Sequence, residues 1–399
     1  MKIGILTLHR PSNFGANLQA YSSFRYFLSL GYDVKVVDYV RNKDVDYKNS
    51  VVEKQFAAHK LFVEQNLKLT RQISDTEGLI NVVKEEHFDA IIIGADAVWR
   101  SPKDDCIYFA KWVFQTPELD HVKVASISPA HMGNGFHDVT EGTRQTIKKC
   151  LEKFAFITTR DEWTKNIINR DIFSNNNFIK HINPDPVVTL YRFVGTEKWQ
   201  SCGIAPKSYI VMTLPVDWTR PSRFREKRIK WFSTFKKLVN NAGLSLVQLP
   251  TPEGKVDLPF DYTIDYPIDS IQWFLWIRNS KGFCGIRFHA VVSSISNGVP
   301  FYSMDSYGDH SRLSMVLDML HLHFLARKKD YRSKIRNLLQ TSGFEDCRTG
   351  RFLEFESPYH VFDLLVQSDA SKILDFRNKL ENTFDNNMDG LIKAISNTK

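Results

Sequence analysis

At 399 residues the chain is long for a single hydrophobic core, so two domains are the expected organisation. Hydrophobic residues make up 43% and charged residues 25%, as in ordinary globular proteins, and no apolar run approaches the roughly 20 residues of a membrane helix. The net charge of +8 is uneven, because residues 220–237 carry eight Lys or Arg and one Glu, a local sum of +7. Subtracting +7 from +8 leaves +1 for the remaining chain, which disfavours a general nucleic-acid-binding class.

Strands and helices alternate through the first half of the chain. Short apolar runs predict strands at residues 3–8, 31–39, 88–96, 122–128 and 154–160. Amphipathic stretches between them predict helices at residues 13–30, 79–86 and 140–153. Residues 40–75 are polar and irregular, which predicts an insertion that contains a helix.

A second series follows a predicted linker at residues 190–206. Strands are expected at residues 209–214 and 244–249, from Lys281 and again from Val299, with helices at residues 223–241, 268–278 and 287–297 and beyond Val361. This repeated order predicts two doubly wound α/β domains facing a cleft. We assign residues 1–190 to an N-terminal Rossmann-like domain and residues 191–345 to a second one. Residues 346–399 are expected to form a helical segment that packs back across the molecule.

The cysteines indicate a reducing compartment. Their number is odd and no Cys-x-x-Cys occurs, so neither a disulfide framework nor a zinc site is predicted. The apolar run at residues 1–9 is too short for a signal peptide and predicts a strand, so the expected location is cytoplasmic. The five residues are Cys106, Cys150, Cys202, Cys284 and Cys347.

Residues 281–300 carry the most informative pattern, which is a strand, a turn and a helix. Gly282 and Gly285 allow a tight turn or a close approach of the backbone. Arg287 and His289 then fall at the helix N-terminus, where unpaired N–H groups favour an anion and imidazole can exchange protons. The alternative is that Arg287 caps a carbonyl group and that His289 is a buried, hydrogen-bonded histidine.

The first strand and helix offer a second group of candidates. Asn13 is expected to cap the helix, and Gly15 permits close approach to its N-terminus. Asn17 and Gln19 are either surface amides or substrate contacts.

Three further candidates follow predicted strands. Asp96 is a candidate general base or ligand of a sugar hydroxyl, with the capping of a turn as the alternative. His131 lies in a glycine-containing loop. Arg160 precedes a helix opened by Asp161, as Arg287 precedes its own helix, and both arginines are expected outside the core.

The helix predicted at residues 223–241 has an apolar stripe and a basic face. Its simplest interpretation is an amphipathic helix with a solvated basic face. Contact with an anionic membrane leaflet or an anionic acceptor is the alternative. A module that binds nucleic acid is a third, because Trp231, Phe232 and Phe235 alternate with cations there. No acidic or Cys partner lies near His321 and His323, so no metal is predicted.

Six sequence blocks occur in an order that resembles one known family. The first is Asn-Phe-Gly-Ala-Asn-Leu-Gln-Ala-Tyr at residues 13–21, and the others are residues 88–99, 157–162, 185–186, 287–289 and 312–320. Together they resemble the polysaccharide pyruvyl transferase family over about residues 1–325. The resemblance implies two Rossmann-like domains of the glycosyltransferase B architecture. It also implies transfer of the enolpyruvyl unit of phosphoenolpyruvate onto two sugar hydroxyls, forming a pyruvate ketal.

The resemblance also assigns roles. Arg160, Arg287, Phe288 and His289 match positions implied in phosphoenolpyruvate binding, with His289 as the proton donor. The chemistry of the reaction, apart from the resemblance, makes Asp96 a candidate for the catalytic base, with His131 as the alternative. The acceptor is expected at Asn13, Gly15, Asn17 and His131. No metal or cofactor is implied. The expected partners are phosphoenolpyruvate and a sugar acceptor, with a lipid-linked acceptor at the inner membrane surface as one alternative, and no nucleic acid.

Two alternative functions remain open. The nearest is a nucleotide-sugar-dependent glycosyltransferase of the same architecture. A Cys284–His289 nucleophile pair is disfavoured, because Cys284 lies in an apolar run that is typical of a core.

Overall fold

The structure is a computed structural model that describes residues 1–40, 50–100, 106–131, 135–136, 139–175, 177–221, 225–304, 334–340, 342–348 and 356–397. The chain forms two compact units that are discontinuous in sequence. The first comprises Met1–Asp46, His59–Thr189 and Lys379–Lys399, and the second comprises Tyr47–Ala58 and Leu190–Asn378. The sequence block at residues 312–320, His321 and His323 lie outside the described residues.

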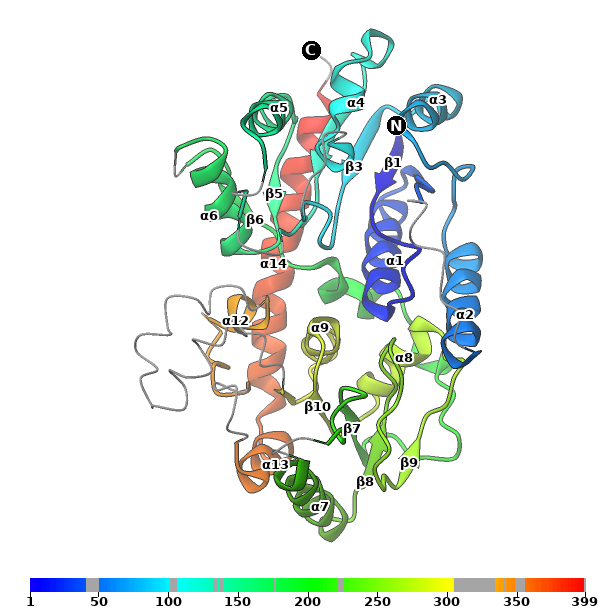
Figure 1. The fold of residues 1–399 in the computed structure, drawn as a ribbon, viewed down its shortest axis with the longest axis vertical. Helices are drawn as coiled ribbons and strands as arrows, with labels where there is room; N and C mark the ends of the chain where they lie inside the picture. The colour runs from blue at the N-terminus through cyan, green and yellow to red at the C-terminus, as the bar shows by residue number, and fades with distance from the viewer. Residues whose placement is uncertain are drawn as a thin grey trace. The chain divides into compact units, whose positions relative to one another are not determined.

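The first unit is built on a parallel sheet with the strand order β2-β1-β3-β4 (Figure 1). Isolated parallel bridges join Val36 to Leu69 beyond β2 and Ala125 to Phe156 beyond β4, just before the parallel pair β5-β6. The chain therefore runs outward from β1 in one direction and then returns to its other side, as in a Rossmann fold. The strands are β1 (Lys2–Leu6), β2 (Asp33–Val36), β3 (Ala90–Ile93), β4 (Lys123–Ser126), β5 (Thr158–Thr159) and β6 (His181–Ile182).

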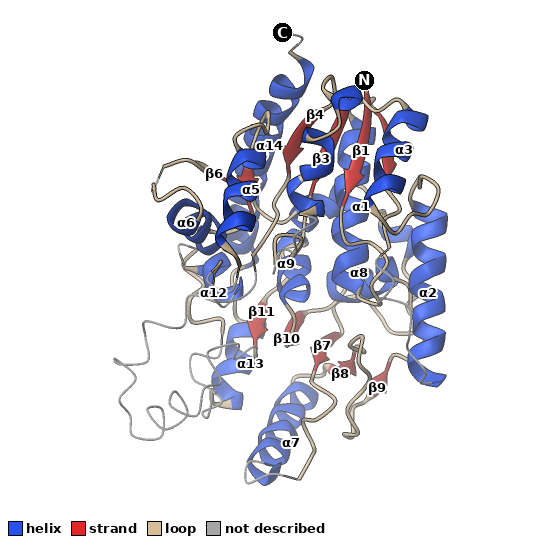
Figure 2. Cartoon of the chain, turned by 45° about the horizontal axis from the view of Figure 1, so that its top comes forward, coloured by secondary structure: helices blue, strands red, loops and turns tan. Residues whose placement is uncertain are grey.

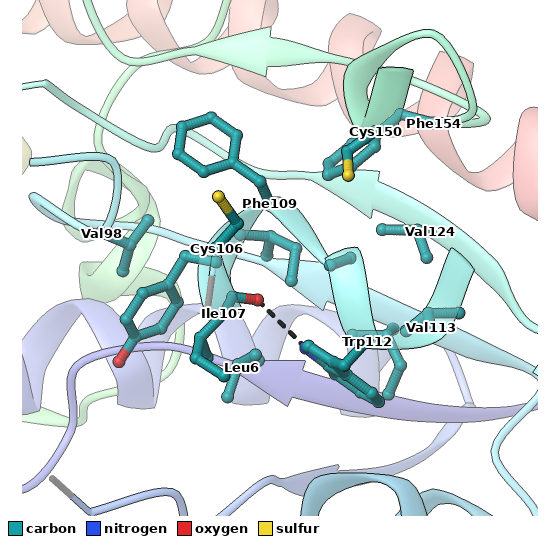
Figure 3. Packing of buried hydrophobic residues seen from close by; sticks show 14 of the residues in the cluster. Leu6, Val98, Cys106, Ile107, Phe109, Trp112, Val113, Val124, Cys150 and Phe154 are labelled. Atoms are coloured by element: carbon teal, nitrogen blue, oxygen red, sulfur yellow. Dashed lines mark hydrogen bonds between the residues drawn. The ribbon is translucent and has the colours of Figure 1, made fainter. Parts of the chain in front are cut away.

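An apolar core covers one face of this sheet (Figure 3). Leu6 and Val124 of the strands pack with Val113 and Trp112, and the indole N–H of Trp112 donates to the Ile107 carbonyl at 3.1 Å. The segment that carries these aromatic residues was not predicted. The helices that contribute to the unit are α1 (Phe14–Ser29), α2 (Ser50–Asn66), α3 (Thr76–Glu86), α4 (Lys111–Phe114), α5 (Glu141–Leu151), α6 (Glu162–Asp171) and α14 (Ala370–Ser396), with 3-10 turns η1 (Ile107–Phe109) and η2 (Pro117–Leu119).

The second unit has a parallel sheet with the order β11-β10-β7-β8-β9. Its strand order again reverses at β7, the first strand of this sheet along the chain. Helices α8 and α9 lie on one face, and α7 and α13 lie on the other (Figure 2). The strands are β7 (Tyr209–Thr213), β8 (Ser245–Gln248), β9 (Tyr262–Thr263), β10 (Gly282–Gly285) and β11 (Phe301–Ser303). The helices are the end of η3 (Pro186–Arg192), η4 (Thr196–Lys198), α7 (Arg225–Asn241), α8 (Ser270–Arg278), α9 (Phe288–Ser296), α12 (Lys334–Leu339), α13 (Pro358–Val366) and the start of α14.

The two-domain α/β prediction is confirmed, and most elements lie within three residues of their expected bounds. Two element predictions need correction. The strand expected at residues 154–160 is regular only at Thr158–Thr159, with one isolated bridge at Phe156 before it, and the C-terminal helical stretch is interrupted between Val366 and Ala370. Among the described residues, no helix is both long and apolar enough to cross a membrane.

Candidate functional site

The strand order of the first sheet reverses between β1 and β3, and two loops meet at that point. Open α/β sheets bind ligands at such switch points. One loop follows β1 and the other follows β3. Gln19 joins them, because its Nε2 donates to the Leu8 carbonyl at 2.7 Å and its Oε1 accepts from the Ala95 N–H at 3.3 Å. A fully buried amide therefore fixes the separation of the two loops.

The predicted acceptor residues at helix α1 have two different roles in the fold. Asn13 caps the helix, and Asn17 is buried and supports a neighbouring loop. The Oδ1 of Asn13 accepts from the Gly15 N–H at 2.9 Å, so the predicted cap is confirmed. Asn17 is fully buried, and its Nδ2 donates to the His9 carbonyl at 2.9 Å while its Oδ1 contacts His59 Nδ1 at 2.5 Å. The surface-amide alternative is wrong for both Asn17 and Gln19, since neither has any exposed surface. Asn17 supports the loop after β1.

A buried ionic network that sequence reasoning missed closes the same loop. His9 Nε2 lies 2.9 Å from Asp38 Oδ1, and Arg10 reaches both oxygens of Asp38 at 2.9 and 2.5 Å. Burial opposes ionisation of Asp38, but the hydrogen bonds from His9 and Arg10 outweigh it and lower its pKa to about 2. All three residues directly follow strands β1 and β2, which was the signal available in the sequence.

Arg160 is a buried cation held between two carboxylates. Its Nη1 lies 3.4 Å from Asp96 Oδ1 and 3.3 Å from Asp185 Oδ2, and its side chain is only 2% exposed. The expectation that Arg160 lies outside the core is therefore wrong. Asp161 caps α6 by accepting from the Thr164 N–H at 2.7 Å, so a carboxylate already occupies that helix N-terminus.

Asp96 occupies an unusual backbone position at the end of this arrangement. Its φ of +63° is in the left-handed region, which Asp tolerates better than most residues. The carbonyl of Asp96 accepts from the Ala130 N–H at 2.7 Å, and Pro129 in turn accepts from the Arg160 N–H at 3.0 Å. The structure thus brings together Asp96 and Arg160, as two of the predicted site residues, and adds Asp185.

His131 follows strand β4 and has a buried, neutral ring. Its backbone N–H donates to Thr164 Oγ1 at 2.9 Å, and its ring packs on Phe136 with centroids 4.7 Å apart. Neither ring nitrogen has a hydrogen-bond partner within the described part of the chain. Burial lowers the pKa of His131 to about 4, against the opposing influence of Asp161 and Asp171, so the imidazole is uncharged near neutral pH.

In the second unit the strand order reverses between β7 and β10, and Arg287 lies at that point, directly before helix α9. The Ile286 N–H donates to the Thr213 carbonyl at 3.0 Å, and Thr213 Oγ1 donates back to the Ile286 carbonyl at 2.8 Å. A Cβ at Gly285 would lie 2.2 Å from the Thr213 oxygen, so only glycine fits there. Arg287 has a φ of +97°, a strained conformation for a residue with a side chain.

The Arg287 side chain forms an ion pair through Nη2 with Glu253 and does not cap helix α9. The two side chains are 28% and 52% exposed. Glu253 lies in the turn between Thr251 and Gly254 after strand β8, and no pattern in the sequence linked it to Arg287. A partly buried guanidinium is thus held by a carboxylate that solvent can reach.

Phe288 and His289 form the first turn of α9, with their rings 5.3 Å apart. His289 is half-buried, which differs from the buried histidine of the alternative interpretation. Cys284 is fully buried in β10, and burial raises the pKa of its thiol, so the core assignment of this residue is confirmed. No group of three or more potential metal-ligating side chains occurs among the residues that the structure describes.

Two solved structures share this fold along nearly the whole chain. The UDP-GlcNAc 2-epimerase from Methanocaldococcus jannaschii has a TM-score of 0.50 and 11% identity, covering 96% of this chain and 100% of that chain. The spinosyn forosaminyltransferase SpnP has a TM-score of 0.51 and 9% identity, covering 100% of both chains. At these identities the likeness concerns the fold alone, and it defines an α/β protein of two Rossmann-like units in the glycosyltransferase B class.

Comparison of the sequence with known protein families identifies one family with this fold. The family described as polysaccharide pyruvyl transferase matches residues 13–307, well over half of the 399 residues. The chain therefore belongs to the polysaccharide pyruvyl transferase family, and the resemblance predicted from its sequence blocks is confirmed. No curated protein matches the chain in sequence. Membership implies a transferase that acts on a polysaccharide or its sugar precursor.

The two candidate arginines should differ sharply in their effect on stability. Arg160→Ala leaves two buried carboxylates without their cation, so we expect the free energy of unfolding to fall by about 3–5 kcal/mol. Arg287→Ala removes a partly exposed pair and should cost less than about 1 kcal/mol. Urea denaturation measures both, and adding Asp96→Asn and Asp185→Asn to Arg160→Ala should restore part of the loss. Equal effects of the two arginine substitutions would contradict this interpretation.

Release of Arg287 from Glu253 should strengthen anion binding. Because a partly exposed pair is worth up to about 1 kcal/mol, Glu253→Gln should raise the affinity for inorganic phosphate by about two- to fivefold in titration calorimetry. Asp257→Asn is the matched control, since Asp257 is an exposed acid in the same loop region. The same increase in both variants would show a general charge effect and not a specific competition for Arg287.

Proposed function

We propose that this protein transfers the enolpyruvyl unit of phosphoenolpyruvate onto two hydroxyls of a sugar in a polysaccharide or its precursor, forming a pyruvate ketal. The observation that carries the proposal is the placement of Arg287 beside His289 at the reversal point of the second sheet. Membership of the family supports the same chemistry. Acid–base groups of the chain suffice for the scheme, so we propose no metal or cofactor.

The donor carries a phosphate and a carboxylate, and the second unit offers groups suited to both. Arg287 presents a planar fork of donors on a partly buried side chain. The first turn of α9 adds backbone N–H groups that have no side-chain cap from Arg287. Phe288 supplies an apolar surface beside them. In this scheme the donor displaces Glu253 from Arg287.

His289 is the proposed general acid. It transfers a proton to the methylene carbon of the donor, which becomes a methyl group and leaves a cationic centre at the adjacent carbon. One acceptor hydroxyl attacks that centre and loses its proton to a base. The bond to the phosphate oxygen then breaks, and the second hydroxyl attacks to close the ketal. Of the two hydroxyl protons, one replaces the proton given by His289 and the other leaves with phosphate.

The first unit supplies the proposed acceptor side. Asp96 and His131 are both candidates for the base that accepts the hydroxyl proton. His131 is uncharged near neutral pH, and its ring nitrogens have no hydrogen-bond partner among the described residues, but its pKa of about 4 makes it a weak base until a neighbouring charge raises it. Asn13 and Gly15 shape the loop edge, and Asn17 acts by positioning that loop. Donor binding by Arg160 stays a prediction, and its contacts also suit it to orienting Asp96.

Mass spectrometry of candidate sugar acceptors, incubated with the protein and phosphoenolpyruvate, tests the function directly. We expect the acceptor to gain one carboxyethylidene group while inorganic phosphate is released. No glycosyl transfer gives this mass change. Transfer of a hexose from a nucleotide sugar, without any product from phosphoenolpyruvate, would replace the proposal with the glycosyltransferase alternative.

His289→Gln should separate binding from chemistry. Because Arg287 and the helix N–H groups remain, we expect donor affinity within about tenfold of the wild type. Turnover should fall by roughly a hundredfold or more, the usual worth of a general acid, and the upper limb of its pH profile should disappear. Calorimetry and steady-state rates provide the two measurements. Near-normal turnover of the variant would remove His289 from the mechanism.

A further inference from the structure

Helix α7 carries a surface of cations that the proposed chemistry does not use. We call this surface the basic face, and it consists of Arg225, Lys227, Lys230 and Lys237. All four side chains are exposed, and none of them forms an ion pair with a described residue. By contrast, Lys236 of the same helix pairs with Asp261 at 2.9 Å. The positive charge of the basic face is therefore not neutralised by the neighbouring described residues.

The aromatic residues of α7 cannot serve this face. Trp231, Phe232 and Phe235 are 7%, 1% and 0% exposed and pack in the core of the second unit. Binding of single-stranded nucleic acid relies on aromatic rings that stack on bases, and these rings are already covered. The structure therefore disfavours the nucleic-acid interpretation that rested on these three rings, and the exposed surface of α7 itself is chiefly charged.

Helix α13 packs beside α7, as both views show (Figures 1 and 2), and it adds an exposed aromatic residue. The indole N–H of Trp231 donates to the Glu356 carbonyl at 2.7 Å, which ties the start of α13 to α7. Tyr359 in the first turn of α13 is 59% exposed, the largest exposure among the described large apolar side chains. Tyr359 thus lies on a helix that packs against the helix with the basic face, and exposed Tyr together with cations is typical of surfaces that meet a lipid interface.

We propose that the basic face and Tyr359 dock the protein on an anionic lipid surface. Each Lys or Arg close to such a surface contributes roughly 1 kcal/mol, and the attraction decays within a Debye length, about 8 Å at physiological salt. Docking would bring the chain to a lipid-linked form of the acceptor, and that part alone rests on the proposed function. Lipid binding itself is measured without donor or acceptor, so its failure is distinguishable from a failure of the transfer reaction.

Co-sedimentation of the full chain with vesicles tests the proposal. One set contains phosphatidylcholine alone, and the other contains equal parts of phosphatidylcholine and phosphatidylserine. We expect binding to the anionic vesicles only, with release by added salt. The variant Arg225→Gln, Lys227→Gln, Lys230→Gln, Lys237→Gln should bind several hundredfold more weakly, at about fivefold for each cation. Tyr359→Ala should weaken the binding that persists at high salt.

A charge-matched control removes four exposed lysines that lie elsewhere. The substitutions are Lys68→Gln, Lys149→Gln, Lys379→Gln and Lys393→Gln, all at exposed positions without an ion pair to a described residue. This control should keep nearly all of the vesicle binding. Equal losses in the two quadruple variants, or equal and negligible binding to both vesicle types, would overturn the proposal. Retention on single-stranded DNA that depends on the basic face, without vesicle binding, would overturn it in favour of nucleic acid.

Discussion

In each unit the first strand of the sheet pairs in parallel with a strand on either side, and this pairing determines where polar groups can gather. The loops that follow parallel strands all lie at one edge of the sheet. Where the strand order reverses, two of those loops lead away in opposite directions and leave a crevice between them. The reversal lies between β1 and β3 in the first unit and between β7 and β10 in the second. Gln19 joins the loops in the former, and Thr213 with Ile286 joins them in the latter. The candidate residues Asp96 and Arg287 both occupy these loops.

The two arginines at strand ends illustrate how burial divides similar sequence patterns into different roles. Arg160 is enclosed and pairs with Asp96 and Asp185, which compensates three charges that would otherwise be costly to bury. Arg287 pairs with Glu253 at a position that water reaches, where screening leaves little net energy in the pair. A ligand anion can therefore replace Glu253 at low cost, whereas displacing either partner of Arg160 would leave a buried charge. In the proposed function, these energetics favour Arg287 over Arg160 for the first contact with the anionic donor.

The sequence was sufficient for the class of fold and for the positions of most elements, because the alternation of apolar strands and amphipathic helices is a local property. It also located Asp96, Arg160 and Arg287 at strand ends. It could not reveal that Arg160 is buried or that Glu253 reaches Arg287, because partners distant in sequence leave no periodic signal. Asn17 shows the same limit. From the sequence alone, an amide on a helix is as compatible with an exposed position as with a buried one that supports a loop.

Asp96 and Arg287 are two of the nine described non-glycine residues whose φ is positive. Asp96 and Arg287 both have positive φ values, +63° and +97°, and such conformations cost of order 1–3 kcal/mol unless their surroundings enforce them. Hydrogen bonds enforce them here, from Ala130 to the Asp96 carbonyl and between Thr213 and Ile286. Under the proposed function, this enforced backbone would direct the Asp96 carboxylate toward an acceptor and the Arg287 guanidinium toward the donor.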